Sequence, residues 1–342
     1  MRVFVTGHRG YIGSHLVDLL REEGFHVVGC DLNLFDDCES YTRVPPNEEL
    51  VKDVREVTPR DLDGIDAVMH LAAISNDPMG DLDEQLTRDV NFHGSVHMAQ
   101  MAKRAGVERF LFAGSCSVYG KGPSPSMTEQ DALAPLSVYA RSKVDSEKAI
   151  ADLADSSFSP IFLRNATAFG DSPMLRIDLV ANNLLTCALV HGEIRIMSDG
   201  SPWRPLIHCR DIAHAFVALA KAPRDRVHNQ VINVGGNVEN YQVRDVADRV
   251  QELVPRANVV YTGEVGADPR DYRVNFDRLR ELLPDFRLEF DLRSGLQKLH
   301  ERLVRSNFDR AAFDGDRFVR LRTLRKRLNM FSTRTFARPA TP

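Results

Sequence analysis

The chain has 342 residues, of which 43% are hydrophobic, and its formal net charge at pH 7 is −4. This length is enough to bury one large core or two joined cores. No stretch reaches 18 consecutive apolar residues and a strand is predicted from Arg2, so we expect neither a membrane span nor a cleaved signal peptide. The five cysteines form no CxxC pair and no metal-ligand spacing, which indicates reduced thiols in a cytoplasmic protein without a metal site.

The first motif is a glycine-rich loop between a predicted strand and a helical pattern. It places glycines at positions 7, 10 and 13. Gly7 permits a tight turn, Gly10 lets the backbone approach a pyrophosphate, and Gly13 allows close helix packing. The N-terminus of the helix then faces the phosphate charge. The loop therefore predicts a dinucleotide site.

The second predicted strand ends in Asp31, 18 residues after Gly13. A carboxylate at this place accepts hydrogen bonds from both hydroxyls of an adenosine ribose and repels a 2′-phosphate. Asp31 therefore favours NAD over NADP. The alternative interpretation is that Asp31 only caps a loop.

Strand and helix patterns alternate along the first half of the chain. Such alternation is typical of an α/β fold with a Rossmann-type, doubly wound parallel sheet, in which ligands bind beyond the carboxyl ends of the strands. We expect an NAD-binding domain at 1–170 and 211–239, a smaller C-terminal α/β substrate lobe at 171–210 and 240–295, and a basic helical tail at 296–342. The predicted strands are 3–6, 27–31, 67–71, 110–115, 161–165, 193–197 and 230–234, and the predicted helices are 11–23, 83–105, 138–153, 178–191, 211–220, 243–253 and 278–283.

A further cluster joins Tyr139 and Lys143 with Ser115 at the end of a predicted strand. Tyrosine and lysine four residues apart share one face of a helix. A tyrosine base near neutral pH needs its pKa of about 10 lowered by about three units. A lysine ammonium one turn away and a positive nicotinamide ring can supply much of that shift. Alone, the spacing also fits an exposed amphipathic helix, but behind a glycine-rich loop it predicts a catalytic set.

With these motifs, residues 1 to about 295 resemble the extended short-chain dehydrogenase/reductase family, in its nucleotide-sugar epimerase and dehydratase branch. The resemblance also includes Asp53-Val54-Arg55, His70-Leu71-Ala72-Ala73 and the segment from Arg204 to Asp211. It implies NAD as the cofactor and Ser115, Tyr139 and Lys143 as catalytic residues. The cofactor-binding residues that it implies are Gly7, Gly10, Tyr11, Ile12, Gly13, Asp31, Asp53, Val54, Leu71, Ala72, Ala73, Asn91, Tyr139 and Lys143.

The same resemblance implies a nucleotide-diphosphate sugar as substrate. Arg204 and Arg270 stand where relatives place arginines near the diphosphate, and Arg176 is a weaker candidate. A guanidinium suits this task because it forms paired charged hydrogen bonds with phosphate oxygens. Each of these arginines can instead belong to a surface ion pair.

Three further residues are implied for the substrate. Asn183 matches an amide on the nucleotide side, and Ser117 and Thr167 match positions that face the sugar. Relatives usually carry asparagine where this chain has Thr167, and Asn165 lies two positions earlier. The identity of the sugar and of the base therefore stays open.

The residues favour 4-epimerisation through a transient 4-keto sugar, because Ser115, Tyr139 and Lys143 with NAD suffice for it. Related 4,6-dehydratases carry Asp-Glu after the strand hydroxyl, where this chain has Cys116 and Ser117. A 4-ketoreductase or another dehydratase remains the alternative. A non-catalytic nucleotide-sensing module is disfavoured because all three catalytic residues are present. Cys116 is interpreted as a packed residue, with a role as acid or base left open.

The tail at 317–342 holds eight basic residues and no acidic residue. Its apolar residues Phe318, Leu321, Leu324 and Leu328 recur at helical spacing, which favours docking on the acidic body over binding to nucleic acid or a membrane. We further expect a homodimer, formed by the helices at 83–105 and 138–153. The small residues Ala99, Ala102 and Ala105 would let these helices approach their mates.

Overall fold

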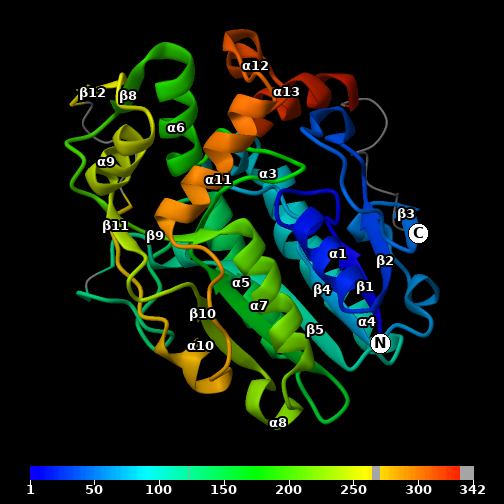
Figure 1. Cartoon of the computed structure of the whole chain (residues 1–342). Coiled ribbons are helices and arrows are strands. Elements are labelled where there is room, and N and C mark those ends of the chain that lie inside the picture. Colours follow the sequence, from blue (N-terminus) through cyan, green and yellow to red (C-terminus); the bar gives the residue numbers. More distant parts are fainter. Residues whose placement is uncertain (123, 264–269, 332–342) are drawn as a thin grey trace.

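A sheet of seven parallel strands forms the centre of the computed structural model, which describes residues 1–122, 124–263 and 270–331, with side chains to 327 (Figure 1). The spatial order β10-β6-β5-β4-β1-β2-β3 reverses direction at β1 and β4, as in a doubly wound sheet. The predicted Rossmann-type fold is confirmed. The strands are β1 (Arg2–Thr6), β2 (His26–Asp31), β3 (Glu48–Val51), β4 (Ala67–His70), β5 (Arg109–Ser115), β6 (Ser159–Asn165) and β10 (Gln230–Val234).

Helices cover both faces of this sheet because successive side chains of each strand point to opposite faces. Along β1, Val3 and Val5 join the core beneath α1 (Gly13–Glu22) and α7 (Cys209–Lys221), the helices in front of the sheet in Figure 1. Phe4 joins the core on the other face, beneath α4 and α5. The elements on and beside that face are α2 (Asp77–Gly80), α3 (Glu84–Thr87), α4 (Gly94–Arg104) and α5 (Val138–Ala151). Short helix α8 (Arg224–Val227) instead packs its Val227 into the core beneath α1 and α7.

A second core lies in the C-terminal half of the chain. There β9 pairs with β7 and β11, and β8 pairs with β12. The expected boundary at 295 falls inside α11, whose Leu296, Leu299 and Leu303 pack into this core. The elements of this part are β7 (Thr167–Phe169), α6 (Val180–His191), β8 (Glu193–Ile196), β9 (Trp203–His208), β11 (Asn240–Gln242), α9 (Val243–Leu253), β12 (Asn258–Tyr261) and α11 (Leu292–Arg305). Helix α10 (Asp277–Leu282) instead packs its Leu279 into the core beneath α1 and α7.

The helix predicted at 83–105 is divided by a π-helical turn at Arg88–His93 between α3 and α4. Ala99 and Ala102 are fully buried in the core of this chain. They therefore face the sheet, and the expectation that they pack against a second copy is wrong.

The end of the described chain folds back onto its beginning. Short helix α12 (Arg310–Asp314) leads into α13 (Arg320–Phe331), which lies in red beside the blue segment that follows β2 (Figure 1). Arg327 pairs with Asp37 of that segment. Among the described residues, no helix combines the length and the apolar character needed to cross a membrane.

Candidate active site

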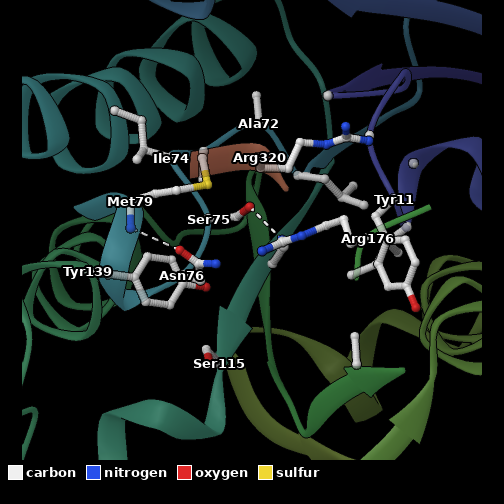
Figure 2. A pocket seen from close by; sticks show the side chains of 18 of the residues that line it. Tyr11, Ala72, Ile74, Ser75, Asn76, Met79, Ser115, Tyr139, Arg176 and Arg320 are labelled. Atoms are coloured by element: carbon white, nitrogen blue, oxygen red, sulfur yellow. Dashed lines mark hydrogen bonds between the residues drawn. The ribbon is translucent and has the colours of Figure 1, made fainter. Parts of the chain in front are cut away.

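One cavity of about 330 Å³ opens at the carboxyl ends of β1, β2, β4, β5 and β6. This is where a doubly wound sheet binds its ligands. The glycine-rich loop forms part of its wall, and the segment 71–77 after β4 forms another part. Figure 2 shows the side chains of Tyr139, Ser115 and Arg176 in this cavity, with Arg320 of α13 beside them.

The glycine-rich loop has the geometry of a phosphate cradle. Gly7 has a positive φ of 68°, and a Cβ atom there would lie 2.8 Å from the Ala72 nitrogen. A Cβ atom on Gly13 would lie 2.1 Å from the Gly7 carbonyl oxygen. Gly7, Gly10 and Gly13 line the cavity, and no side chain caps the start of α1. The helix N-terminus is therefore open to an anionic group, so these residues fit the pyrophosphate of a dinucleotide.

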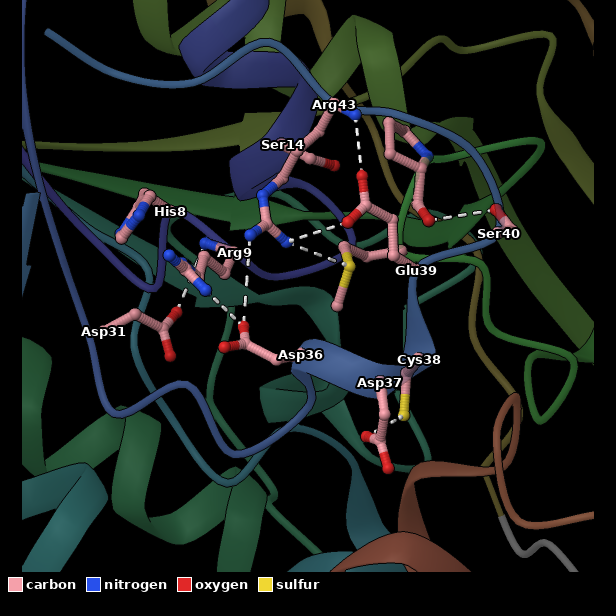
Figure 3. A network of polar contacts seen from close by, with 12 residues as sticks. His8, Arg9, Ser14, Asp31, Asp36, Asp37, Cys38, Glu39, Ser40 and Arg43 are labelled. Atoms are coloured by element: carbon pink, nitrogen blue, oxygen red, sulfur yellow. Dashed lines mark hydrogen bonds and ion pairs between the residues drawn. The ribbon is translucent and has the colours of Figure 1, made fainter.

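Asp31 lies at the cavity wall and is held by two backbone amides. Its carboxylate accepts hydrogen bonds from the Asn33 nitrogen at 2.9 Å and the Arg9 nitrogen at 3.2 Å. The Arg9 guanidinium points toward Asp36, with which it forms a hydrogen bond of 2.5 Å (Figure 3). It also donates to Glu49, at 2.5 and 2.8 Å. Since Asp36 and Glu49 already neutralise Arg9, its charge is not presented to a 2′-phosphate. This arrangement fits NAD.

Most of the other predicted cofactor residues also line the cavity. The Tyr11 hydroxyl donates to the Gly170 carbonyl oxygen at 2.7 Å, so it connects the loop to the residue that follows β7. The Asp53 carboxylate is engaged by Arg55 at 2.6 Å. Asn91 does not line the cavity: it is fully buried behind the wall, where its amide group binds both backbone groups of Ile74. The lining residues of this set are Tyr11, Ile12, Asp53, Val54, Leu71, Ala72 and Ala73.

Ser115, Tyr139 and Lys143 meet in the same cavity. Burial raises the pKa of Tyr139 to about 12; the nearby Asp77 carboxylate adds to this shift and a hydrogen bond with Ser115 opposes it. Burial also lowers the pKa of Lys143 to about 7, and its Nζ atom donates to the Ala113 carbonyl oxygen at 2.7 Å. The lowered tyrosine pKa that the sequence predicts is therefore not found in the protein without cofactor, because burial raises the pKa of Tyr139.

Two buried oxygen atoms in the cavity wall have no hydrogen-bond partner. They are Oγ of Ser117 and Oδ1 of Asn165. Thr167 also lines the cavity, so Asn165 and Thr167 both reach it. Cys116 lies outside the lining, its thiol donates to the Arg164 carbonyl oxygen at 3.1 Å, and burial raises its pKa. This is the packed position that the sequence favours for Cys116.

The structure separates the predicted substrate arginines. Arg270 and Arg176 line the cavity, whereas Arg204 and Asn183 do not. Arg204 donates to the Arg270 carbonyl oxygen at 2.5 Å, so it supports the segment that carries Arg270. Asn183 donates to the Ile177 carbonyl oxygen at 3.1 Å.

A carboxylate that sequence reasoning missed also faces the cavity. Asp77, in the first turn of α2, receives hydrogen bonds from Arg270 at 2.6 Å and from Ser137. Its charge contributes to the raised pKa of Tyr139. The sequence signal was the pair Asn76-Asp77 before Pro78, in which Asn76 caps the short helix.

Residues 3–235 match the family model described as the NAD dependent epimerase/dehydratase family. The chain belongs to this family. A curated relative, UDP-glucose 4-epimerase of Mycolicibacterium smegmatis, is 30% identical over 296 residues, which cover 83% of this chain and 92% of that protein. The cofactor of this family is NAD, as predicted from the glycine-rich loop and Asp31.

Two solved structures of similar proteins extend this comparison. The NAD-dependent NDP-hexosamine 5,6-dehydratase TunA superposes with a TM-score of 0.78 at 25% identity, covering 89% of this chain and 98% of its own. MoeE5 in complex with UDP-glucuronic acid and NAD gives a TM-score of 0.77 at 29% identity, covering 90% of this chain and 100% of its own. The similar proteins thus include an epimerase and a dehydratase, and family membership does not fix the reaction class.

Proposed function

We propose that this enzyme is an NAD-dependent 4-epimerase of a nucleotide-diphosphate sugar. The observation that carries the proposal is that Ser115, Tyr139 and Lys143 line one cavity together with the glycine-rich loop and Asp31. UDP-sugars are the first substrates to test, because the epimerase relative is named for one of them. The name of this relative supports the choice of substrate class.

The proposed roles of the residues follow from where they lie. Tyr139 takes the proton of the sugar C4 hydroxyl and later returns it, and Ser115 hydrogen bonds to the reacting oxygen. Lys143, in its ammonium form, favours the tyrosinate by its charge. Bound NAD supplies the acceptor and later the donor of the C4 hydride, and its positive ring favours the tyrosinate further.

The remaining polar groups suit a sugar diphosphate. The unpaired oxygens of Ser117 and Asn165 can accept hydrogen bonds from sugar hydroxyls, because buried acceptors without a partner are costly. Arg270 and Arg176 provide guanidinium groups for the diphosphate. The 4-keto sugar must rotate in the cavity before the hydride returns to its opposite face. Its hydrogen bonds with the cavity wall therefore have to form again in the rotated orientation.

Asp77 supports a second candidate function. A dehydratase needs an additional acid or base, and the Asp77 carboxylate faces the cavity close to Tyr139. The likeness to a dehydratase of known structure points in the same direction. Asp77 is, however, engaged by Arg270 and Ser137, which favours a role in holding the cavity wall.

The test is to incubate the enzyme with UDP-, dTDP- and GDP-sugars in deuterated water without added NADH, and to follow the products by NMR. A 4-epimer without deuterium at C5 supports the proposal. A deoxy keto product or an unsaturated product with solvent deuterium would establish a dehydratase, and in that case Asp77→Asn should abolish turnover. Conversion only of 4-keto sugars with stoichiometric reduced cofactor would establish a ketoreductase.

A further inference from the structure

The C-terminal helix α13 forms part of the wall of the NAD cavity. Arg320 and Leu324 of this helix line the cavity together with the glycine-rich loop. The helix lies beyond residues 3–235, which match the family model, and it belongs to the basic tail that the sequence assigned only to docking. A segment outside the matched region therefore borders the cofactor.

Contacts on both sides fix α13 at this place. Phe318 and Leu324 are each only 5% exposed. The Phe318 carbonyl oxygen accepts a hydrogen bond from the Ile177 nitrogen at 3.0 Å, and Arg327 pairs with Asp37. The helix thus connects the segment after β2, which carries the adenosine side of a Rossmann site, with the segment before α6.

The Arg320 side chain is a buried cation in this wall of the cavity. It is 4% exposed, and its guanidinium donates to the carbonyl oxygens of Met174 and Arg317, at 3.0 Å each. It lies over the Phe35 ring at 4.9 Å from the centroid. Within the described part of the chain, no carboxylate forms an ion pair with Arg320.

The carboxylate whose charge acts on Arg320, that of Asp178, is already engaged by another arginine. Asp178 forms two hydrogen bonds with Arg176, at 3.0 and 2.8 Å, and Arg176 faces the same part of the cavity (Figure 2). The Asp178 charge also acts on Arg320, but among the described residues the carboxylate forms its ion pair with Arg176. A buried charge without a counterion is costly, and the open N-terminus of α1, which lines the same cavity, adds positive potential. This side of the cavity is built to receive an anion.

We propose that Arg320 binds the diphosphate of NAD and that α13 closes the outer wall of the cofactor site. Two groups carry a diphosphate in this family, the cofactor and a nucleotide-sugar substrate. The cofactor is favoured because Phe35, beneath Arg320, follows Asp31 by four residues and lines the cavity with it. The proposal does not depend on which reaction the enzyme catalyses.

The experiment compares Arg320→Gln with Arg325→Gln in the full chain. Arg325 is exposed on the same helix, so its replacement removes the same charge without touching the cavity. Calorimetry on nucleotide-free protein would measure the dissociation constants of ADP-ribose and UDP, and NMR titration would measure that of adenosine, which lacks phosphate. Arg320→Gln should weaken ADP-ribose at least ~10-fold, the scale of a lost charged hydrogen bond, with less than ~3-fold effects on adenosine and UDP.

Each other result overturns the proposal. Weakened UDP with unchanged ADP-ribose would assign Arg320 to the substrate. Equal weakening of ADP-ribose and adenosine would show that the variant only loosens the cavity wall. An equal effect of Arg325→Gln, or no effect of either variant, would show that Arg320 makes no specific contact with a phosphate. Thermal unfolding of both variants checks that the helix remains docked.

Discussion

The Nζ atom of Lys143 lies 5.7 Å from the centroid of the Tyr139 ring, one turn away on α5. Both side chains line the cofactor cavity, and burial moves their pKa values apart, to about 7 for Lys143 and about 12 for Tyr139. Without cofactor at neutral pH, the lysine is therefore close to half protonated and the tyrosine keeps its proton. The protonation states of Lys143 and Tyr139 therefore depend on which charged groups occupy the cavity.

The lowered pKa of Lys143 predicts a pH-dependent stability of the cofactor-free protein. Between about pH 7 and 9.5 the folded lysine loses its proton while the unfolded lysine retains it, so the unfolded chain binds more protons and stability rises with pH. The pKa falls from 10.5 to about 7, which sets an upper limit of about 3 kcal/mol for the rise over that interval.

Urea unfolding at several pH values would measure this rise in the wild type and in Lys143→Met. The variant also loses the bond to the Ala113 carbonyl oxygen, but that loss shifts its stability by a constant amount. The slope against pH should be smaller in Lys143→Met. Parallel curves for the two proteins would contradict the lowered pKa.

Tyr139→Phe should reduce turnover by at least ~10²-fold, the scale of general acid-base catalysis. The ring remains and only the hydroxyl is removed, so NAD binding should change little. Steady-state rates and the amount of NAD retained after purification would be measured together. Full activity in the variant would exclude Tyr139 from proton transfer, whereas loss of NAD would indicate damage to the cavity.

Asp31→Ala should narrow the preference for NAD over NADP, mainly by weakening NAD. The carboxylate that would meet the ribose hydroxyls disappears, while Arg9 stays paired with Glu49 and Asp36 and offers no new charge to a 2′-phosphate. Dissociation constants of both cofactors by calorimetry would test this. Equal constants for NAD and NADP in the wild type would contradict the role of Asp31.

We also predict a homodimer formed through the outer surfaces of the helical segment at 84–104 and of α5. Since Ala99 and Ala102 are buried, exposed residues such as Arg88 and Asp145 must make the contacts. Light scattering at micromolar concentration should give about twice the chain mass of 38.4 kDa. A mass near that of the single chain would contradict the dimer.

The sequence predicted the parts of the site that depend on local chemistry. The glycine-rich loop, Asp31 and the Tyr139–Lys143 spacing each require particular residue types at fixed separations, and all of them line the cavity. The alternation of strands and helices was equally informative, although β3 was missed because this strand has only four residues and begins with two glutamates.

What the sequence did not predict depends on contacts between distant segments. Asp77 and Arg320 reach the cavity only because α2 and α13 pack across it, and neither helix carries a motif that points there. Asn183 was predicted as a substrate residue from the resemblance, yet its side-chain amide donates a hydrogen bond to the Ile177 carbonyl oxygen. The raised pKa of Tyr139 likewise arises from burial, which residue spacing does not reveal.

The most direct test of the central claim is the fate of the C4 hydrogen. A nucleotide sugar that the enzyme converts would be prepared with deuterium at C4 and incubated in ordinary water without added cofactor. If the enzyme is a 4-epimerase, NMR will show the 4-epimer with deuterium retained at C4, because the same hydride returns to the sugar. Loss of the label from C4, or its appearance at another carbon of the product, would contradict this account.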